Sequence, residues 1–554
     1  MQQLNSIKMA TKPKWMEKAL SKEEQKNLLH FQQHFNPELG VVVFPDQATS
    51  SLLTLQFCRL LCRSGSEKQL SLAQQALEGF FRPQITDPED ENYGGIPLRI
   101  GAGYRDKNAP LFHLPLLLEI RSCPALSKKA CTILDEGLKR LLAGAERRWH
   151  EETFDLHRDF KGYTNVFLMY IQALLLGAGY LGLPRWQRRA ECEWKRWFHH
   201  VSYYGIDECV STVYHEVDHE TLIRLSGLFS EKTFKDQVRM VIGHLEATQR
   251  ILEHPRLRLP VCGSSRDYRR FLRPGTGRFK PFEGSAGEVR RSFPYEAEGR
   301  ATTLPFRFKS WQDSHSGLGT MTGGYYFWQN LYGLVMAGES EQKRELAFLP
   351  GTFSTTPGFV DQKGSRALFV FGRVPSSLYR TQMPTPDDRI PEDMGFFGMG
   401  VTTGWSVVAD KPGRLHLSAY GQELFLDAFA VEGGCCVPAP LRKIRRPAGE
   451  ETRLASSFEC DIDEYLFPDK TTWFGVVLEL RKITANVPAM ARVELEMKGR
   501  SRHFKCGDLG VSLFESPTGE QVQLYPEDWR TLPLFRSPDH LLWPGQWLQQ
   551  SINA

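Results

Sequence analysis

The chain has 554 residues, of which 41% are hydrophobic and 24% charged, so it is long enough for more than one hydrophobic core and too apolar for global disorder. Its 69 basic and 65 acidic residues are well mixed and leave a formal charge of +4, which argues against nucleic acid as a partner. The N-terminal stretch lacks the apolar run of a signal peptide, and no later segment offers about 18 uninterrupted apolar residues. We therefore expect a soluble cytoplasmic protein without a membrane partner, whose scattered cysteines are reduced thiols.

The first half of the chain is predicted to be helical. Between residues 21 and 255, apolar residues recur at helical spacing, and Pro or Gly interrupts the pattern between helices. The clearest helices are expected at residues 22–35, 50–63, 68–81, 126–152, 165–182, 184–205, 219–229 and 231–253. Short joins make successive helices into antiparallel hairpins, and a ring of hairpins is an (α/α) toroid, of the incomplete or six-hairpin type. The helix at 165–182 is apolar nearly all round, which indicates a buried inner helix.

The second half is predicted to be antiparallel β structure. From residue 305 onward, apolar and polar residues alternate with period two between turn residues, a pattern typical of a β-sandwich. The clearest strands are expected within residues 366–374, 414–431, 472–483 and 491–506. The intervening segment is rich in Arg, Gly and Pro, which indicates a linker or a surface excursion. The predicted organisation is an N-terminal extension at 1–20, a toroid at 21–255, a linker at 256–304 and an antiparallel β-sandwich at 305–554.

Polar side chains gather where two helices of the first half begin. Arg105, Asp106 and Asn108 precede an apolar helix, and Tyr163 and Asn165 open the inner helix. Helix capping accounts for one or two of these residues. An Asn in the first turn of an inner helix is also placed to turn its amide toward a central cleft.

The densest polar cluster leads into the helix expected at 219–229. The start of a surface helix would explain His215, Glu216, Asp218 and His219, because the helix dipole favours acidic residues in a first turn. The adjacent Tyr214 and His215 have a phenol and an imidazole, which can serve as a general acid and base. The five residues from His215 read HEVDH and match the HExxH pattern of zinc metalloproteases. Because the further ligand and the Met-turn of that class are not evident, we expect no metal.

A histidine in the second half has two possible roles. His315 lies in a Gly- and Ser-rich bend that is followed by Trp328 and Gln329. The bend and the aromatic run can be a turn and a core strand. Alternatively, this loop closes over the helical half and brings His315 into a shared site, since pockets form preferentially between domains.

In order and spacing, these segments resemble bacterial proteins in which an alginate lyase-like or heparinase II/III-like toroid precedes a β-sandwich. The resemblance spans roughly residues 90–335. The residues that carry it are Asp106-Lys107-Asn108, Tyr163-Thr164-Asn165-Val166, Glu208 followed by Ser211, Tyr214, Val217 and Asp218, and Leu318-Gly319-Thr320 followed by Trp328-Gln329. The sequence departs from the family at Val210 and Thr212, where the family has Asn and Pro.

The resemblance implies carbohydrate metabolism, with β-elimination on an acidic oligosaccharide or polysaccharide that contains uronic acid, and without a cofactor. Asn108, Asn165 or Arg105 would neutralise the C5 carboxylate. Tyr214 and His215 would act as acid and base, with His315 as a second candidate base. The resemblance further implies substrate contacts from Arg105, Asp106, Tyr163, Glu208, Trp328 and Gln329, and it leaves a homo-oligomer open.

Two other functions stay open at this point. A glycoside hydrolase would use a pair of carboxylates on the same toroid, and Asp106 with Glu208 or Glu216 is the pair to test. A non-catalytic glycan-binding or scaffold protein would keep the cleft without the chemistry, which the departure at Val210 favours. The sugar, its linkage and endo or exo action do not follow from the residues.

Overall fold

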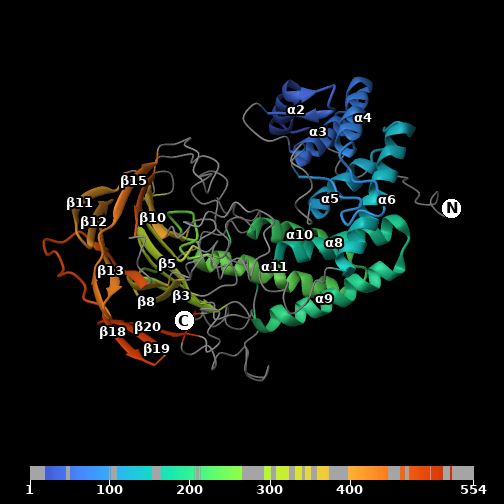
Figure 1. Cartoon of the computed structure of the whole chain (residues 1–554). Coiled ribbons are helices and arrows are strands. Elements are labelled where there is room, and N and C mark those ends of the chain that lie inside the picture. Colours follow the sequence, from blue (N-terminus) through green and yellow to red (C-terminus); the bar gives the residue numbers. More distant parts are fainter. Residues whose placement is uncertain are drawn as a thin grey trace. The chain divides into compact units, whose positions relative to one another are not determined.

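The computed structural model describes residues 19–44, 50–98, 100, 109–151, 164–204, 206, 211, 214–264, 292–300, 307–322, 331–339, 344–350, 358–372, 397–402, 404–446, 462–467, 473–499, 501–515 and 524–526. Nine helices lie in this part of the chain (Figure 1): α2 (Lys22–His34), α3 (Ser51–Ser64), α4 (Glu67–Phe81), α5 (Ala109–Arg121), α6 (Lys128–Glu151), α8 (Thr164–Leu181), α9 (Pro184–Tyr204), α10 (His215–Leu228) and α11 (Lys232–Leu252). A short hairpin, β1 (Phe35–Asn36) with β2 (Val41–Val42), follows α2.

The remaining described strands follow α11 and form three antiparallel sheets. The eight-stranded sheet has the order β15-β16-β10-β7-β6-β5-β4-β3 and contains β3 (Tyr295–Arg300), β4 (Arg307–Asp313), β5 (Ser316–Thr322), β6 (Gly333–Ala337), β7 (Arg344–Pro350), β10 (Phe397–Thr402), β15 (Arg442–Arg446) and β16 (Ile462–Leu466). The seven-stranded sheet has the order β11-β12-β13-β17-β9-β8, with β14 also on β13, and contains β8 (Gly358–Lys363), β9 (Arg366–Gly372), β11 (Ser406–Lys411), β12 (Arg414–Ala419), β13 (Gln422–Glu432), β14 (Cys435–Pro438) and β17 (Trp473–Lys482). The four-stranded sheet joins β18 (Glu494–Lys498), β19 (Ser501–Cys506), β20 (Leu509–Glu515) and β21 (Leu524–Pro526).

The predicted order of a helical half followed by an antiparallel half is confirmed. Every helix named from the sequence is present, and the apolar segment after Asn108 forms the further helix α5. One helix start was wrong, because α10 begins at His215, one turn before the expected His219. The backbone carbonyl of Ser211 accepts the His215 N–H at 3.0 Å, which continues the helical hydrogen bonding toward the N-terminus. That the helices close into a toroid stays a prediction.

Backbone contacts divide the chain into two compact units. The first contains residues 1–160 and 166–194, and the second contains 161–165 and 195–554. The last two helices, α10 and α11, therefore belong to the same unit as the sheets. The boundary predicted at residue 255 follows the change from helical to alternating periodicity. The compact units instead reflect which helices and strands pack against one another.

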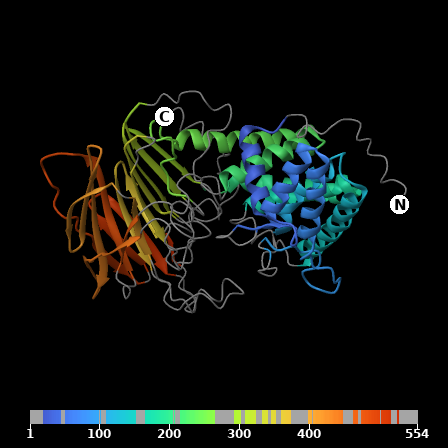
Figure 2. The same ribbon diagram turned by 90° about the horizontal axis from the view of Figure 1, so that it is seen from above.

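The eight- and seven-stranded sheets share one hydrophobic core. Inward-facing residues of β9, among them Phe369 and Phe371, meet residues of β7 such as Phe348 across the two sheets. The Phe348 and Phe369 rings stack with their centroids 4.3 Å apart. Figure 2 shows these sheets as layers within the second unit. Because successive side chains of a strand point to opposite faces of its sheet, every second residue can contribute to this core.

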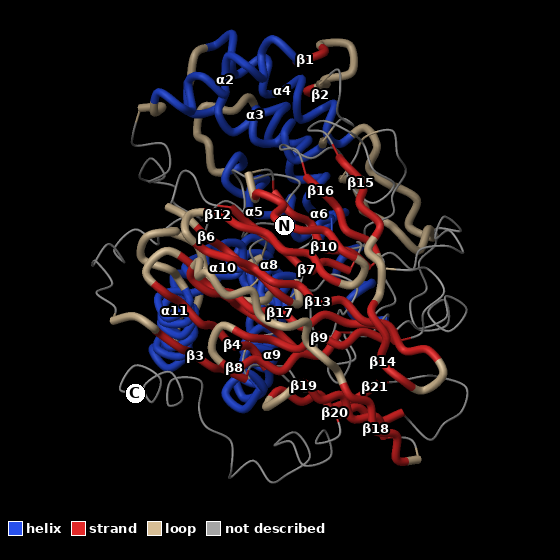
Figure 3. Tube along the Cα trace, turned by 90° about the vertical axis from the view of Figure 1, so that its left-hand side faces the viewer, coloured by secondary structure: helices blue, strands red, loops and turns tan. Residues whose placement is uncertain are grey.

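A second core separates the seven-stranded sheet from the four-stranded one. Leu368 and Val370 lie on the opposite face of β9 and pack with Phe504 and Val511 of β19 and β20. Figure 3 shows the β18–β21 group beside β8 and β9. β9 is thus buried on both faces, which explains its nearly continuous apolar sequence. The alternating pattern predicted a β-sandwich and did not predict this further four-stranded sheet.

The segment after α11 is packed more tightly than a linker. Leu257, Leu259 and Val261 are buried and pack with Leu331 and neighbouring residues of β6. Strand β3 begins at Tyr295, inside the stretch interpreted as linker. The surface interpretation was wrong for these parts, because the Arg-, Gly- and Pro-rich composition masked a short apolar alternation. Residues 265–291 lie outside the described residues.

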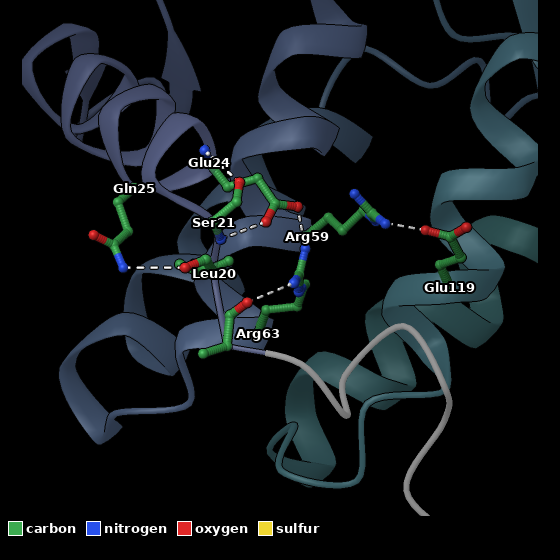
Figure 4. A network of polar contacts seen from close by, with 8 residues as sticks. Leu20, Ser21, Glu24, Gln25, Arg59, Arg63 and Glu119 are labelled. Carbon is green, nitrogen blue, oxygen red and sulfur yellow. Dashed lines mark hydrogen bonds and ion pairs between the residues drawn. The ribbon is translucent and has the colours of Figure 1, made fainter. Parts of the chain in front are cut away.

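The first unit is held together by polar contacts as well as by apolar packing (Figure 4). The Ser21 hydroxyl accepts the Glu24 N–H at 3.2 Å, and the Ser21 N–H donates to the Glu24 carboxylate at 2.9 Å, which closes a capping box at α2. The same carboxylate pairs with Arg63 of α3, and Arg59 pairs with Glu119 of α5. Partial burial acts to raise the pKa of Glu24, but the Ser21 and Arg63 contacts outweigh it and lower the pKa. The two ion pairs connect helices α2, α3 and α5.

The inner helix α8 is apolar enough and long enough to cross a membrane by composition alone. Of that apolar stretch, 78% is buried inside the protein, as expected for a core helix. Gly177 permits close packing here, since a Cβ at this position would lie 2.4 Å from the Trp186 ring. All nine cysteines in the described ranges are free thiols.

Candidate functional site

The N-terminal turn of α10 presents a buried polar face. His215, Asp218 and His219 are three and four residues apart, so their side chains line up along one side of the helix. They are 3%, 0% and 7% exposed, whereas Glu216 is exposed to solvent. The interpretation of this turn as the start of a surface helix was therefore wrong for His215, Asp218 and His219. A buried carboxylate is costly unless it is paired or hydrogen-bonded, so this turn is specialised for polar contacts.

The facing helix α11 contributes further buried polar groups. His244, Thr248 and Gln249 recur at helical spacing and are 7%, 1% and 3% exposed. At the edge of this face, the His219 imidazole lies 3.2 Å from the Glu246 carboxylate. We name His215, Asp218, His244, Thr248 and Gln249 the hairpin cluster, because all five are buried on the two helices of the α10–α11 hairpin.

Two imidazoles of the hairpin cluster influence each other. Burial and, to a smaller extent, the neighbouring His215 together lower the pKa of His244 to about 4. His244 is therefore neutral at physiological pH. A neutral imidazole can accept a proton, and the enclosing helices limit its exchange with bulk water.

Thr248 and Gln249 supply polar atoms that the described protein residues leave unsatisfied. The Thr248 hydroxyl and both polar atoms of the Gln249 side chain are buried, with no hydrogen-bond partner in the part of the chain that the structure describes. Each such group costs about 1–3 kcal/mol of folding free energy. Groups of this kind mark places where a water or a ligand completes the hydrogen bonding.

The turn that carries His315 is fastened to the end of α11. The Gln312 side chain donates to the Leu252 carbonyl at 3.0 Å. The His254 Nε2 lies 2.6 Å from the Asp313 carbonyl, and its Nδ1 accepts the backbone N–H groups of residues 256 and 257. His315 itself lies 2.8 Å from the Arg256 guanidinium. The β4–β5 turn thus meets the helical hairpin, and the action of His315 at the hairpin cluster stays a prediction.

Of the other predicted site residues, some are described by the structure and some lie outside the described ranges. Asn165 is the second residue of α8, is 2% exposed, and belongs to the same compact unit as α10 and α11. Tyr214 directly precedes α10, and its N–H donates to the Ser211 hydroxyl at 3.2 Å. Residues outside the described ranges are Arg105, Asp106, Asn108, Tyr163, Glu208, Trp328 and Gln329, together with Val210 and Thr212.

The HExxH match falls on described residues, whereas Asp106, which each hydrolase pair requires, does not. Within the described ranges, no group of three or more His, Cys, Asp and Glu side chains is arranged to hold a metal ion. Glu216, the glutamate of the HExxH match, points to solvent rather than toward the hairpin cluster. The hydrolase pair of Asp106 with Glu208 lies outside the described residues.

Comparisons with known proteins give a chain-wide but distant likeness. No protein-family model matches the chain, and no curated protein sequence matches it. Among solved structures, a heparinase III (the BT4657 gene product) aligns over 90% of this chain and 91% of its own, with 10% identity and a TM-score of 0.37. A heparan sulfate lyase, HepC from Pedobacter heparinus, aligns over 93% and 92%, with 11% identity and a TM-score of 0.35. TM-scores below 0.5 do not establish a shared fold.

Sequence reasoning found one side of the hairpin cluster and missed the other. His244, Thr248 and Gln249 interrupt the apolar stripe that Val241, Leu245 and Leu252 form on α11. Polar residues within an otherwise apolar stripe are a recognisable signal. The sequence motifs did not include them, because the motif residues concentrate around the start of α10.

Proposed function

We propose that this chain is a polysaccharide lyase that cleaves a uronic-acid-containing glycan by β-elimination, with its acid–base chemistry at the start of α10. The observation that carries the proposal is the buried pair of imidazoles, His215 of α10 and His244 of α11, together with the Tyr214 phenol that directly precedes His215. The resemblance around Asn165 and Tyr214 supports the same reaction. We further propose a cytoplasmic location and an acidic oligosaccharide or polysaccharide as the substrate.

The chemistry assigns a separate task to each group. His215 takes the C5 proton, the electron pair forms the C4=C5 bond, and the C4–O4 bond breaks. Tyr214 supplies the proton that the departing O4 requires. The Asn165 amide donates to the C5 carboxylate and stabilises the charge that develops there. Because His244 is neutral, no second positive charge opposes proton uptake at His215.

Purified full-length protein incubated with uronate-containing glycans tests the proposal. A lyase produces a conjugated C4=C5 double bond, which is followed by its ultraviolet absorbance. We expect His215→Ala and Tyr214→Phe each to lower turnover by about a hundredfold or more. The matched controls are His503→Ala on β19 and Tyr93→Phe in the first unit, which should keep wild-type turnover.

The alternatives give different results in the same assay. New reducing ends without the chromophore would identify a hydrolase, and saturable glycan binding without cleavage would identify a binding or scaffold protein. Loss of activity on chelation would point to the HExxH alternative. Full activity in both His215→Ala and Tyr214→Phe would remove the proposed acid–base pair.

A further inference from the structure

A small hollow opens among the sheets of the second unit, at the end of the hairpin between β12 and β13. Its volume is about 280 Å³, just below the range of about 300–1,000 Å³ that is usual for ligand pockets. A hollow of this size suits a single sugar residue rather than a longer chain. The residues that line it and bear on its chemistry are Arg344, Gly404, Ser406, Ser418, Tyr420 and Ile483.

Tyr420 occupies a backbone position that seldom accepts an aromatic residue. The turn between β12 and β13 consists of Tyr420 and Gly421, with φ angles of 49° and 73°. Two-residue hairpin turns with both φ angles positive usually take Asn, Asp or Gly at the first position. Tyr at this position is strained, and residues in such conformations are concentrated at functional sites. The residue is 42% exposed, so core packing does not explain the choice.

Gly404 makes room for the Arg344 side chain. A Cβ at position 404 would lie 1.9 Å from the Arg344 Nε, and the φ angle of +105° also disfavours other residues. The guanidinium carbon of Arg344 lies 5.8 Å from the centroid of the Tyr420 ring, within the range of a cation–π contact. The glycine and the tyrosine together hold the guanidinium at the wall of the hollow.

Two hydroxyl groups complete the polar lining. Ser406 and Ser418 are direct cross-strand partners on β11 and β12, so their side chains lie side by side on one face of the sheet. Ile483, which is 56% exposed, adds an apolar surface, and its N–H donates to the Gly421 carbonyl at 3.0 Å. A cation, hydroxyls and an aromatic ring within one hollow match the carboxylate, the hydroxyls and the apolar face of an acidic sugar.

We propose that this hollow is an accessory binding site for one anionic sugar residue of a glycan. Arg344 binds the carboxylate or sulfate group, Ser406 and Ser418 bind ring hydroxyls, and Tyr420 packs against the sugar. The glycan as ligand class rests on the proposed function. The site is built from different residues than the hairpin cluster, so its binding is measurable whether or not the chain cleaves glycans.

Calorimetric titration of the full-length protein with glucuronate tests the proposal, with glucose and acetate as probes of the ring alone and the charge alone. We expect saturable binding of glucuronate and at least about tenfold weaker binding of either control probe. Arg344→Gln and Tyr420→Asn should each weaken glucuronate binding by about tenfold or more. His215→Ala, which changes the hairpin cluster alone, should leave glucuronate binding at the hollow unchanged.

Tyr420→Asn separates a binding role from a structural one. Asn tolerates a positive φ, so this variant should raise the melting temperature by roughly 2 °C while it loses the sugar. Wild-type affinity for glucuronate in both Arg344→Gln and Tyr420→Asn would overturn the proposal, as would acetate binding as tightly as glucuronate. Glycan cleavage that persists alongside such a result would leave the proposed lyase function standing.

Discussion

The interface between α10 and α11 and the core between the two large sheets are both buried, but their chemistry differs. The sheets bring together aromatic and aliphatic residues such as Phe348, Phe369 and Leu424. One end of the helical hairpin instead buries His215, Asp218, His244, Thr248 and Gln249. Burial of apolar area stabilises the fold at roughly 25 cal/mol per Å², whereas burial of polar groups lowers stability unless each is satisfied.

The polar end of the α10–α11 interface is not required for folding. In the next turns of the same hairpin, Leu222, Leu225, Val238 and Val241 are buried, so an apolar interface is compatible with the geometry. The polar end is therefore a local feature of the sequence rather than a consequence of helix packing. Violations of folding rules at one place are expected at functional sites.

The largest expected effect comes from the sheet core. Phe369→Ala removes a ring that stacks on Phe348 and has no solvent exposure, so it should lower the free energy of unfolding by about 3–5 kcal/mol. Urea unfolding of the second unit measures the change. Val408→Ala, at a side chain that is 56% exposed, is the control and should stay within about 0.5 kcal/mol. A cost below about 1 kcal/mol for Phe369→Ala would mean that the two sheets do not share this core.

Acidification should affect the helical hairpin through His244. Its pKa is about 4 in the folded protein and near 6.5 when unfolded, so the unfolded chain binds more protons between these values. The contribution of neutral His244 to the free energy of unfolding is therefore complete above about pH 6.5. It is lost as the pH falls through 4, and the total loss is on the order of 3 kcal/mol. Unfolding measured across this range should show a shallower pH dependence in His244→Gln. An unchanged profile would contradict the burial of a neutral His244.

A smaller effect distinguishes a functional polar group from a structural one. Thr248→Val replaces an unsatisfied buried hydroxyl with a methyl group of similar size, so it should raise the free energy of unfolding by about 1 kcal/mol. Thr221→Val on α10 is the matched control, because the Thr221 hydroxyl donates to the Val217 carbonyl at 2.7 Å. The control should lose about 0.5–1 kcal/mol. Destabilisation by Thr248→Val would show that its hydroxyl is satisfied in solution.

Local pattern was enough to predict the order of the elements and most of their positions. The alternation in residues 414–431 corresponds to β12 and β13, and the helical spacing in 231–253 corresponds to α11. These signals are read within a few residues of chain, because side chains repeat with a period of 3.6 in helices and two in strands. The pairing of Tyr214 with His215 was visible for the same reason.

Tertiary structure decided which of these elements share a core and which polar groups meet. Phe369 and Val370 are neighbours in sequence but face different cores, and only the placement of the four-stranded sheet makes both faces of β9 buried. His215 and His244 come from successive helices, and their proximity depends on how the hairpin closes. Likewise, the contact of Arg344 with Tyr420 joins a strand of the eight-stranded sheet to a turn of the seven-stranded sheet. Such contacts form between segments far apart in the chain, where residue periodicity carries no information about partners.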